Sequence, residues 1–321
     1  MESLQQYVNY INEAVALIKY PSKPSGLYEP IAYTISGGGK RIRPVLLLAA
    51  CEALGGLKED AINQAVGLEM FHNFTLLHDD VMDKADIRRG RSTVHVKWNE
   101  STAILSGDAM LTMASMLMSR CAGDKLERVT DLFNRTAMEI YEGQQYDMDF
   151  EARLDVSVEE YVEMIRLKTS VLLGCACELG AIMAGGDDLA CKAFYKYGIS
   201  LGLAFQLQDD WLDTYGDMTV FGKNIGGDIL NDKKTFLLIT ALANADECQR
   251  NKMLSLIGTR SEEKINTIRC IYDNLHVAEK CRELIDYYAK EATDALEVLN
   301  LPAETRTFFS QLADDLRTRN S

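Results

Sequence analysis

Two clusters of aspartates are spaced so that they could bind a metal ion. Each has the pattern DDxxD and follows an apolar run: Asp79, Asp80 and Asp83 form the first cluster, and Asp209, Asp210 and Asp213 form the second. On a helix, the first and last aspartates of the pattern share a face, where their charges repel one another. Oxygen-only ligands favour Mg²⁺, which binds through one or two carboxylates together with water and substrate phosphate. One cluster alone would be compatible with a solvated helix face, but two matched clusters indicate metal binding.

Basic residues follow both clusters closely. Arg88 and Arg89 come directly after the first cluster, and their guanidiniums are suited to bidentate contacts with phosphate. The glycine-rich segment after the second cluster, FGKNIGGDILNDKKTF, carries Lys223, Lys233 and Lys234. Acids that hold a metal, followed by cations that hold phosphate, predict a diphosphate site.

A third basic segment, SGGGKRIRP, spans residues 36–44. It is not a Walker loop, because Arg41 follows the lysine where Ser or Thr would be required. Pro44 suits the first turn of a helix, so Lys40, Arg41 and Arg43 are expected to gather at a helix N-terminus, which favours anions. The alternative is a solvated basic loop.

The elements that must position these residues are predicted to be helices. Proline is costly inside helices, and none of the five prolines lies between Val45 and Leu301. Apolar residues recur at helical spacing, as in Leu4, Tyr7, Ile11, Val15 and Ile18, and again in Leu105, Ala109, Thr112 and Met116. We therefore expect an all-α protein with one domain over residues 1–321. Glycines inside the helical patterns are expected to permit close helix packing: Gly143, Gly174, Gly180 and Gly202.

The overall composition limits the partners and the cellular location. A formal net charge of -14 argues against binding to nucleic acid or to an anionic membrane surface. The eight cysteines lack CxxC spacing, which is typical of reduced thiols. The first residues lack the features of a signal peptide, and no apolar run reaches the length of a membrane span. These features predict a cytoplasmic protein without a transmembrane segment.

The motifs together resemble those of the trans-isoprenyl diphosphate synthases, the polyprenyl synthetases that make geranyl, farnesyl, geranylgeranyl and longer diphosphates. The resemblance covers about residues 36 to 236, in the family's order: GGGKRIRP, LLHDDVMDKADIRRG, GDAML, GQQYD, LKTS, FQLQDDWLD and GK…GGDILNDKKT. It implies a single polyprenyl synthetase domain of roughly ten or more helices around a central cavity. It also implies a head-to-tail prenyltransferase, commonly a homodimer, that condenses isopentenyl diphosphate with dimethylallyl, geranyl or farnesyl diphosphate.

The same resemblance implies a role for individual residues. Both aspartate clusters would hold three Mg²⁺ ions on the allylic diphosphate, with most direct contacts from Asp79, Asp83 and Asp209. Thr169 and Gln206 would direct oxygen atoms towards the allylic cation, and Phe205 would lie near the homoallylic alkene. The allylic diphosphate would be held by Arg88, Lys168, Lys223 and Lys233, and the diphosphate of isopentenyl diphosphate by Lys40, Arg43, His72 and Arg89. His78, beside the first cluster, would be structural.

Product length in this family depends on the residues before the first cluster. Phe74 is bulky, Thr75 is small, and Phe71 lies a further turn away. Several geranylgeranyl synthases carry one aromatic residue, at the Phe74 position, so the resemblance implies a product of C15 to C20, leaning to C20. The alternative is that Phe74 packs in the core and the floor of the product channel lies on another helix.

Two other functions are compatible with some of these motifs. A class I terpene cyclase carries one DDxxD and a second Mg²⁺ motif of a different type, and it does not need the basic residues assigned to isopentenyl diphosphate. A non-catalytic or modulating subunit of a heteromeric synthase tends to lose one acid cluster, whereas this chain has both. The pattern therefore favours the synthase.

Overall fold

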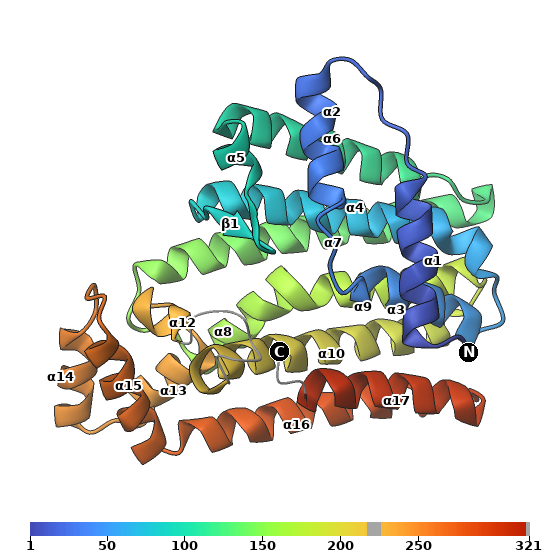
Figure 1. The fold of residues 1–321 in the computed structure, drawn as a ribbon. Coiled ribbons are helices and arrows are strands. Elements are labelled where there is room, and N and C mark those ends of the chain that lie inside the picture. The colour runs from blue at the N-terminus through green and yellow to red at the C-terminus, as the bar shows by residue number, and fades with distance from the viewer. Residues whose placement is uncertain (217–225, 319–321) are drawn as a thin grey trace. The chain divides into compact units, whose positions relative to one another are not determined.

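The computed structural model describes residues 1–216 and 226–318, and their regular structure is almost entirely helical (Figure 1). The strands found in this part of the chain are β1 (Ile87–Arg88) and β2 (Arg91–Ser92), which pair as a short antiparallel hairpin. The all-α prediction is confirmed. Among the helices of these residues, none is long and apolar enough to cross a membrane.

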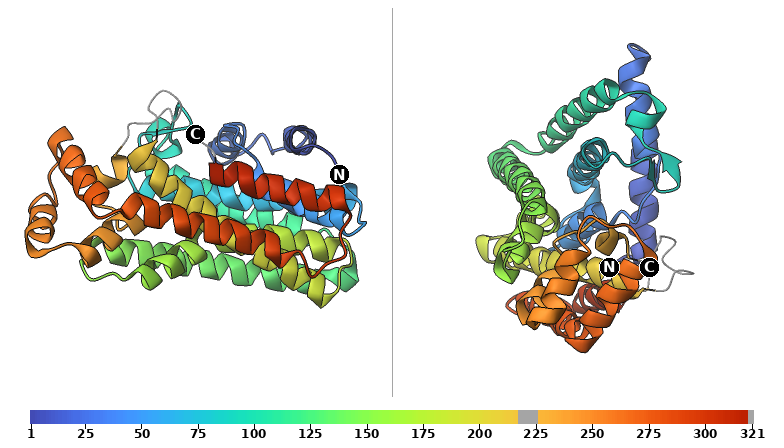
Figure 2. Two further views of the ribbon diagram at one scale, coloured as in Figure 1. Left: turned by 90° about the horizontal axis from the view of Figure 1, so that it is seen from below. Right: turned by 90° about the vertical axis from the view of Figure 1, so that its left-hand side faces the viewer.

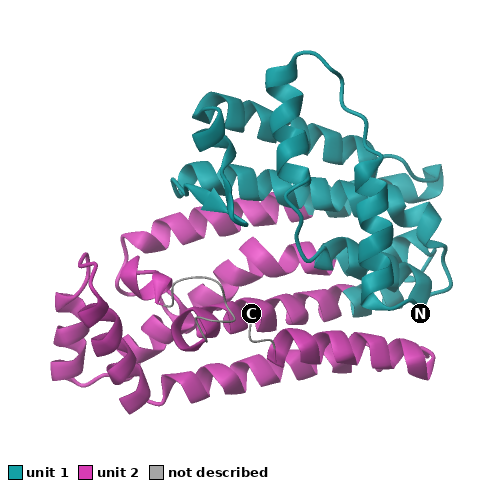
Figure 3. Cartoon of the chain, viewed as in Figure 1, with its two compact units in different colours: residues 1–135, 175–194 teal, residues 136–174, 195–321 magenta. Residues whose placement is uncertain are grey.

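The chain divides into two compact units, each described here by itself (Figure 3). Unit 1 comprises Met1–Arg135 and Cys175–Phe194, and unit 2 comprises Thr136–Gly174 and Tyr195–Ser321. Three helices contain a boundary between the units: α7 (Gly123–Glu151), α9 (Val171–Met183) and α10 (Asp188–Tyr215). The single domain and its central cavity remain predictions.

Unit 1 is built around α4 (Lys58–Met82), a helix of 25 residues that packs against α6, α3 and α2. Acidic Glu59 and Asp60 occupy its first turn, where the helix dipole favours negative charge. Most of its middle is buried, so the helix serves as the core of the unit. The other helices that begin and end in this unit are α1 (Leu4–Ala16), α2 (Ser25–Ile35), α3 (Ile42–Ala53), α5 (Val94–Lys97) and α6 (Glu100–Met118).

Unit 2 contains a cluster of buried apolar side chains that joins its short helices to the C-terminal half of α10. Figure 2 shows α16 and α17 side by side, and α16 also packs against α13 and α15. The helices that lie wholly in this unit are α8 (Val158–Ile165), η1 (Arg166–Ser170), α12 (Gly227–Leu230), α13 (Phe236–Asn244), α14 (Glu247–Ser255), α15 (Glu262–Asn274), α16 (Val277–Ala295) and α17 (Ala303–Thr318).

The glycine prediction is confirmed by the backbone packing. A Cβ at Gly180 would lie 2.2 Å from the carbonyl oxygen of Leu47, and one at Gly143 would lie 2.3 Å from the amide nitrogen of Lys168. A Cβ at Gly202 would lie 2.6 Å from Cα of Ser170, whereas one at Gly174 would meet side-chain atoms at 3.0 Å. At Gly143, Gly180 and Gly202, any larger residue would therefore force the backbones apart.

The helical spacing predicted around Leu105 is also confirmed, but this stripe is not the buried face of α6. Leu105 is 60% exposed and Met116 is 56% exposed, and neighbouring Ile104 is 47% exposed. The face of α6 that packs inward carries Met110 and Met118 together with several small residues. The helix therefore buries a different face from the one that carries Leu105 and Met116.

Candidate active site

The first acid cluster lies at the C-terminal end of α4. Asp79 and Asp80 are in the last turn, and Asp83 is the C-cap residue. The last turn contains no basic residue, although the helix dipole there favours cations over carboxylates. Three acids at this end are therefore electrostatically unfavourable unless a cation joins them.

One member of this cluster is already paired. Asp80 is 5% exposed, and the Nε atom of Arg88 donates to its Oδ1 at 2.7 Å. Burial raises the pKa of Asp80 despite this guanidinium. Arg89, in the turn of the β1–β2 hairpin, has a φ of 52° and donates to the carbonyl of Gly38. The hairpin thus brings Arg88 to the acids and Arg89 to the glycine-rich loop.

The glycine-rich loop does not present all of its basic residues to solvent. Arg41 lies at the helix N-terminus as expected, since it is the N-cap of α3, but its side chain is not available to an anion: it is buried and forms an ion pair with buried Glu69. Its Nε and Nη2 atoms also donate to Asn12 and to the carbonyl of Ile35. Asn73 donates to Glu69 at 2.8 Å and accepts a contact from Arg89 at 3.4 Å. The Arg41–Glu69 ion pair therefore fixes the glycine-rich loop to the interior of unit 1.

The side chains of Arg43 and His72 contact each other. The Nη1 atom of Arg43 lies 3.2 Å from Nε2 of His72. Burial and then the guanidiniums of Arg43, Arg89, Arg88 and Arg41 hold the pKa of His72 well below its usual 6.5. A neutral imidazole here accepts a hydrogen bond and leaves the positive charge on the arginines. Lys40 is exposed at the start of the same segment.

Aromatic side chains lie one to two turns before the first cluster. Phe74 is 5% exposed and packs against Phe71 and His78, with ring centroids 5.4 and 4.8 Å away. Phe71 in turn contacts Phe133, and Thr75 donates to the carbonyl of His72. His78 lies 3.0 Å from the carbonyl of Ile104, which agrees with a structural role.

The second acid cluster occupies the end of α10, again without a basic residue in the last turn. Asp210 is the buried member: it accepts hydrogen bonds from the hydroxyl of Tyr161 and from Nε2 of Gln206, the latter at 3.1 Å. Burial, followed by the charge of Asp228, raises the pKa of Asp210 to about 8. Asp213 accepts from the amide of Asp228 at 2.8 Å, so it fixes the start of α12.

The LKTS motif adopts an unusual backbone conformation. Residues Arg166–Ser170 form a π-helical turn, which is rare and found mostly at functional sites. From this turn, Lys168 forms an ion pair of 2.5 Å with Asp147, and Thr169 donates to Oε1 of Gln206 at 3.1 Å. Hydrogen bonds therefore link Thr169 through Gln206 to Asp210.

The segment after α12 adds two lysines. Nζ of Lys233 lies 3.5 Å from a carboxylate oxygen of Asp228, whereas Lys234 donates to the carbonyls of Asp232 and Glu151. Lys223 lies outside the described residues. Phe205 is partly buried on α10, but it does not line the cavity that Lys168, Thr169 and Gln206 share.

These side chains of unit 2 surround a cavity of about 310 Å³. Its lining includes Lys168, Thr169, Gln206, Lys233 and five carboxylates: Asp147, Asp209, Asp210, Asp213 and Asp228. Within residues 1–216 and 226–318, no three His, Cys, Asp or Glu side chains are arranged to hold a metal ion by themselves. An oxygen-rich cavity of this kind suits Mg²⁺, which uses few protein ligands and completes its shell with water and phosphate.

Three residues contribute to this site although no role was predicted for them from the sequence. Asp228 lies within the quoted GGDILNDKKT motif, and Asp147 lies within GQQYD, so both could have been found from those motifs. Tyr161, seven residues before Lys168, has no local signal, because its partner Asp210 is 49 residues away along the chain.

Comparison with known proteins gives a consistent result. A family model described as polyprenyl synthetase matches residues 24–275. The short chain isoprenyl diphosphate synthase of Methanothermobacter thermautotrophicus is 36% identical over 315 residues, which cover 98% of this chain and 97% of the relative. The geranylgeranyl pyrophosphate synthase of Geoglobus acetivorans is 37% identical over 322 residues, with 99% of both chains covered.

Solved structures agree with these relatives. One described as a geranylgeranyl pyrophosphate synthase has a TM-score of 0.95 and 42% identity, with 100% of both chains covered. Another, a geranylgeranyl pyrophosphate synthase from Corynebacterium glutamicum complexed with isoprenyl diphosphate and magnesium, has a TM-score of 0.84 and 28% identity. It covers 98% of this chain and 96% of its own.

Proposed function

The chain belongs to the polyprenyl synthetase family, and we propose that it condenses isopentenyl diphosphate with an allylic diphosphate to give a C20 trans-prenyl diphosphate. It is a short-chain trans-prenyltransferase. The main structural support for this activity is the cavity of unit 2, which is lined by both lysines and carboxylates. A protein that only bound an apolar prenyl chain would have no use for so many charged side chains along one cavity.

The allylic diphosphate is assigned to the acid clusters and to the lysines beside them. Asp79, Asp83 and Asp209 are proposed as the main metal ligands, and the other aspartates of the two clusters are proposed to act partly through water; among these, Asp80 and Asp210 hold Arg88 and Tyr161. Bound Mg²⁺, proposed as three ions, would neutralise the diphosphate and so improve it as a leaving group. The cations proposed to contact the diphosphate are Arg88, Lys168, Lys223 and Lys233.

The chain's own side chains then control the cation left by ionisation. Thr169 and Gln206 bring a hydroxyl and an amide oxygen to the lining of the cavity, where such dipoles stabilise positive charge. Asp147 holds the ammonium of Lys168 at 2.5 Å, so this donor is positioned before substrate arrives. The alkene of isopentenyl diphosphate attacks the cation, and the proton lost afterwards passes to the released diphosphate.

Isopentenyl diphosphate is assigned to the basic residues of unit 1: Lys40, Arg43, His72 and Arg89. The neutral state of His72 supports this assignment, because a neutral imidazole can share the hydrogen-bonding of Arg43 without adding repulsion to a dense cluster of guanidiniums. Arg41 is not assigned to the substrate, because its guanidinium forms a buried ion pair with Glu69.

Product length and assembly complete the proposal. The names of the relatives support the C20 end of the C15 to C20 range, not its C15 end. A homodimer is also proposed, and the exposed Ile104, Leu105 and Met116 on α6 are large apolar side chains that such an interface would cover. Light scattering after size exclusion should give twice the chain mass.

The proposed function is tested by product analysis. The purified protein is incubated with Mg²⁺, labelled isopentenyl diphosphate and, separately, C5, C10 and C15 allylic diphosphates. We expect elongation from each primer that stops at C20. Cyclic hydrocarbon release without use of isopentenyl diphosphate would support a cyclase instead, and no elongation from any primer would support the partner-subunit alternative.

A further inference from the structure

A buried lysine lies on α15, outside every motif of the chain. Lys264 is 2% exposed and occupies the first turn of α15, after the N-cap Ser261. Both circumstances are unfavourable for a cation, because burial removes its hydration and the N-terminus of a helix carries partial positive charge. A lysine in this place must be compensated by specific partners.

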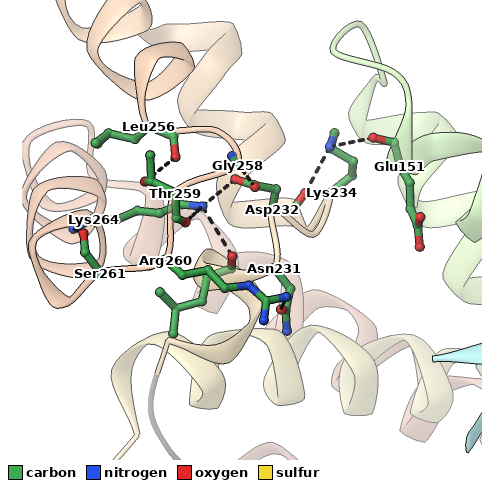
Figure 4. A network of polar contacts seen from close by, with 11 residues as sticks. Glu151, Asn231, Asp232, Lys234, Leu256, Gly258, Thr259, Arg260, Ser261 and Lys264 are labelled. Carbon is green, nitrogen blue, oxygen red and sulfur yellow. Dashed lines mark hydrogen bonds and ion pairs between the residues drawn. The ribbon is translucent and has the colours of Figure 1, made fainter. Parts of the chain in front are cut away.

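The three ammonium protons of Lys264 have three acceptors (Figure 4). Nζ donates to Oδ1 of Asp232 at 2.7 Å, to the carbonyl of Thr259 at 3.0 Å and to the carbonyl of Leu230 at 3.4 Å. The other carboxylate oxygen of Asp232 accepts from the amide of Gly258 at 2.8 Å. The loop between α14 and α15 is therefore fastened to the turn that follows α12.

Asp232 needs such support because of its backbone. Its φ is 55°, in the left-handed region that few residues other than glycine adopt. Arg260 adds a second tie to this turn, through a hydrogen bond of 3.1 Å to Asn231. The turn is thus held in a strained conformation by contacts from the α14–α15 loop and from Lys264.

The residue that follows Asp232 enters the acid-lined cavity. Lys233 stands 3.5 Å from Asp228, while Lys234 uses its ammonium on the carbonyls of Asp232 and Glu151. Asp228, Lys233 and Thr235 also line a second, smaller cavity that Lys264 itself lines. Residues 228–235 therefore form the wall between the two cavities, with the acid cluster on one side and Lys264 on the other.

We propose that Lys264 is a positioning residue for the reaction: its ammonium holds Asp232 in the left-handed conformation and thereby sets where Lys233 stands beside the second acid cluster. The kinetic effect of Lys264 rests on the proposed function, whereas its effect on the conformation of residues 228–235 is inferred from the contacts alone. Lys264 touches neither the acid cluster's cavity nor, by this account, the substrate.

The conformational part is tested by hydrogen exchange on three variants. Lys264→Met removes the charge but keeps most of the side-chain length. Asp232→Asn changes the other partner of the same ion pair, which is the more exposed of the two residues. Lys290→Met is the control, because Lys290 forms an exposed ion pair with Asp294. We expect faster exchange confined to residues 228–235 and the 256–261 loop in the first two variants, and none in the control. Unchanged exchange there, or an equal increase throughout unit 2, would overturn the proposal.

The kinetic part separates positioning from general stability. In Lys264→Met, the KM for the allylic diphosphate should rise and kcat/KM for this substrate should fall by up to about 100-fold, which is what a misplacement of about 1 Å can cost. The KM for isopentenyl diphosphate, whose assigned residues lie in unit 1, should not change. The double variant Lys264→Met/Asp232→Asn should recover much of this loss, because asparagine removes the carboxylate charge that Lys264→Met leaves without its ammonium, and it adopts the left-handed region as readily as aspartate does.

The outcomes distinguish this inference from the proposed function. If the wild-type protein is active and Lys264→Met is folded with both KM values unchanged, the role of Lys264 is refuted while the enzyme assignment stands. If the wild-type protein shows no condensation at all, the proposed function fails, and the local exchange of residues 228–235 still decides whether Lys264 holds this turn.

Discussion

Replacing the buried partner of Glu69 should reveal how strongly unit 1 depends on its internal ion pair. In Arg41→Met, the guanidinium is lost, and the carboxyl group of Glu69, 3% exposed, is left with Asn73 as its hydrogen-bond donor among the described side chains. Breaking a buried pair from one side costs about 3–5 kcal/mol. Because proteins are stable by about 5–15 kcal/mol, this single change should remove a large part of the free energy of unfolding.

The double variant Arg41→Met/Glu69→Met should be much less destabilised. It buries no unpaired charge, and what remains is the loss of hydrogen bonds to Asn12, Ile35 and Asn73, at about 1 kcal/mol each. Glu69→Met alone should cost as much as Arg41→Met. The double-mutant cycle should therefore give a coupling energy of about 3 kcal/mol or more.

The assay is urea unfolding followed by circular dichroism, with the midpoint compared at constant slope. The exposed pair Lys290–Asp294 is the matched control and should show no measurable coupling. The double variant should also bind isopentenyl diphosphate about 10-fold more weakly, equivalent to about 1.4 kcal/mol, because Asn73 loses the Glu69 carboxylate, one of the two acceptors that orient it towards Arg89, and keeps only the Glu69 carbonyl. Additive single losses, or an unchanged KM in the double variant, would refute this reasoning.

Three further variants test the remaining parts of the site. Gly143→Ala would place a Cβ 2.3 Å from the amide of Lys168, so it should displace the π-helical turn and lower kcat about 100-fold, whereas an unchanged kcat would show that the turn can move without consequence. His72 is held neutral in the fold, so its unfolded form gains a proton first as pH falls below 6.5. The contribution of His72 to stability should therefore decrease with falling pH by up to about 1.4 kcal/mol per unit, opposite in sign to the contribution of Asp210, whose pKa is raised. The variant His72→Gln should remove the His72 contribution, while the exposed control His276→Gln keeps it. Phe74→Ala opens space beside Phe71 and should lengthen the product beyond C20; the same product distribution as the wild type would place the floor on another helix.

The sequence allowed the acid clusters and the helical fold to be predicted because both depend on local spacing. DDxxD fixes which carboxylates share a helix face, and the absence of proline from 45 to 301 identifies the helical body. The glycines at 143 and 180 could likewise be assigned to close packing. These features need no knowledge of distant partners.

The supporting residues could not be predicted, because their partners are far along the chain. Arg41 was grouped with its basic neighbours, yet its partner Glu69 lies 28 residues away and turns it inward. Lys264 and Asp232 are 32 residues apart, and neither belongs to a pattern that signals an ion pair. The π-helical turn at Lys168 also depends on packing against Gly143, which local propensity does not reveal.

Both acid clusters are proposed to support one metal-dependent condensation. The most direct measurement is the Mg²⁺ dependence of condensation in the wild type, in Asp79→Asn and in Asp209→Asn, with Asp124→Asn on the first turn of α7 as an exposed control. We predict no activity with EDTA, a loss of at least about 100-fold in each cluster variant, and wild-type activity in the control. Full activity without a divalent metal, or in either cluster variant, would contradict the account.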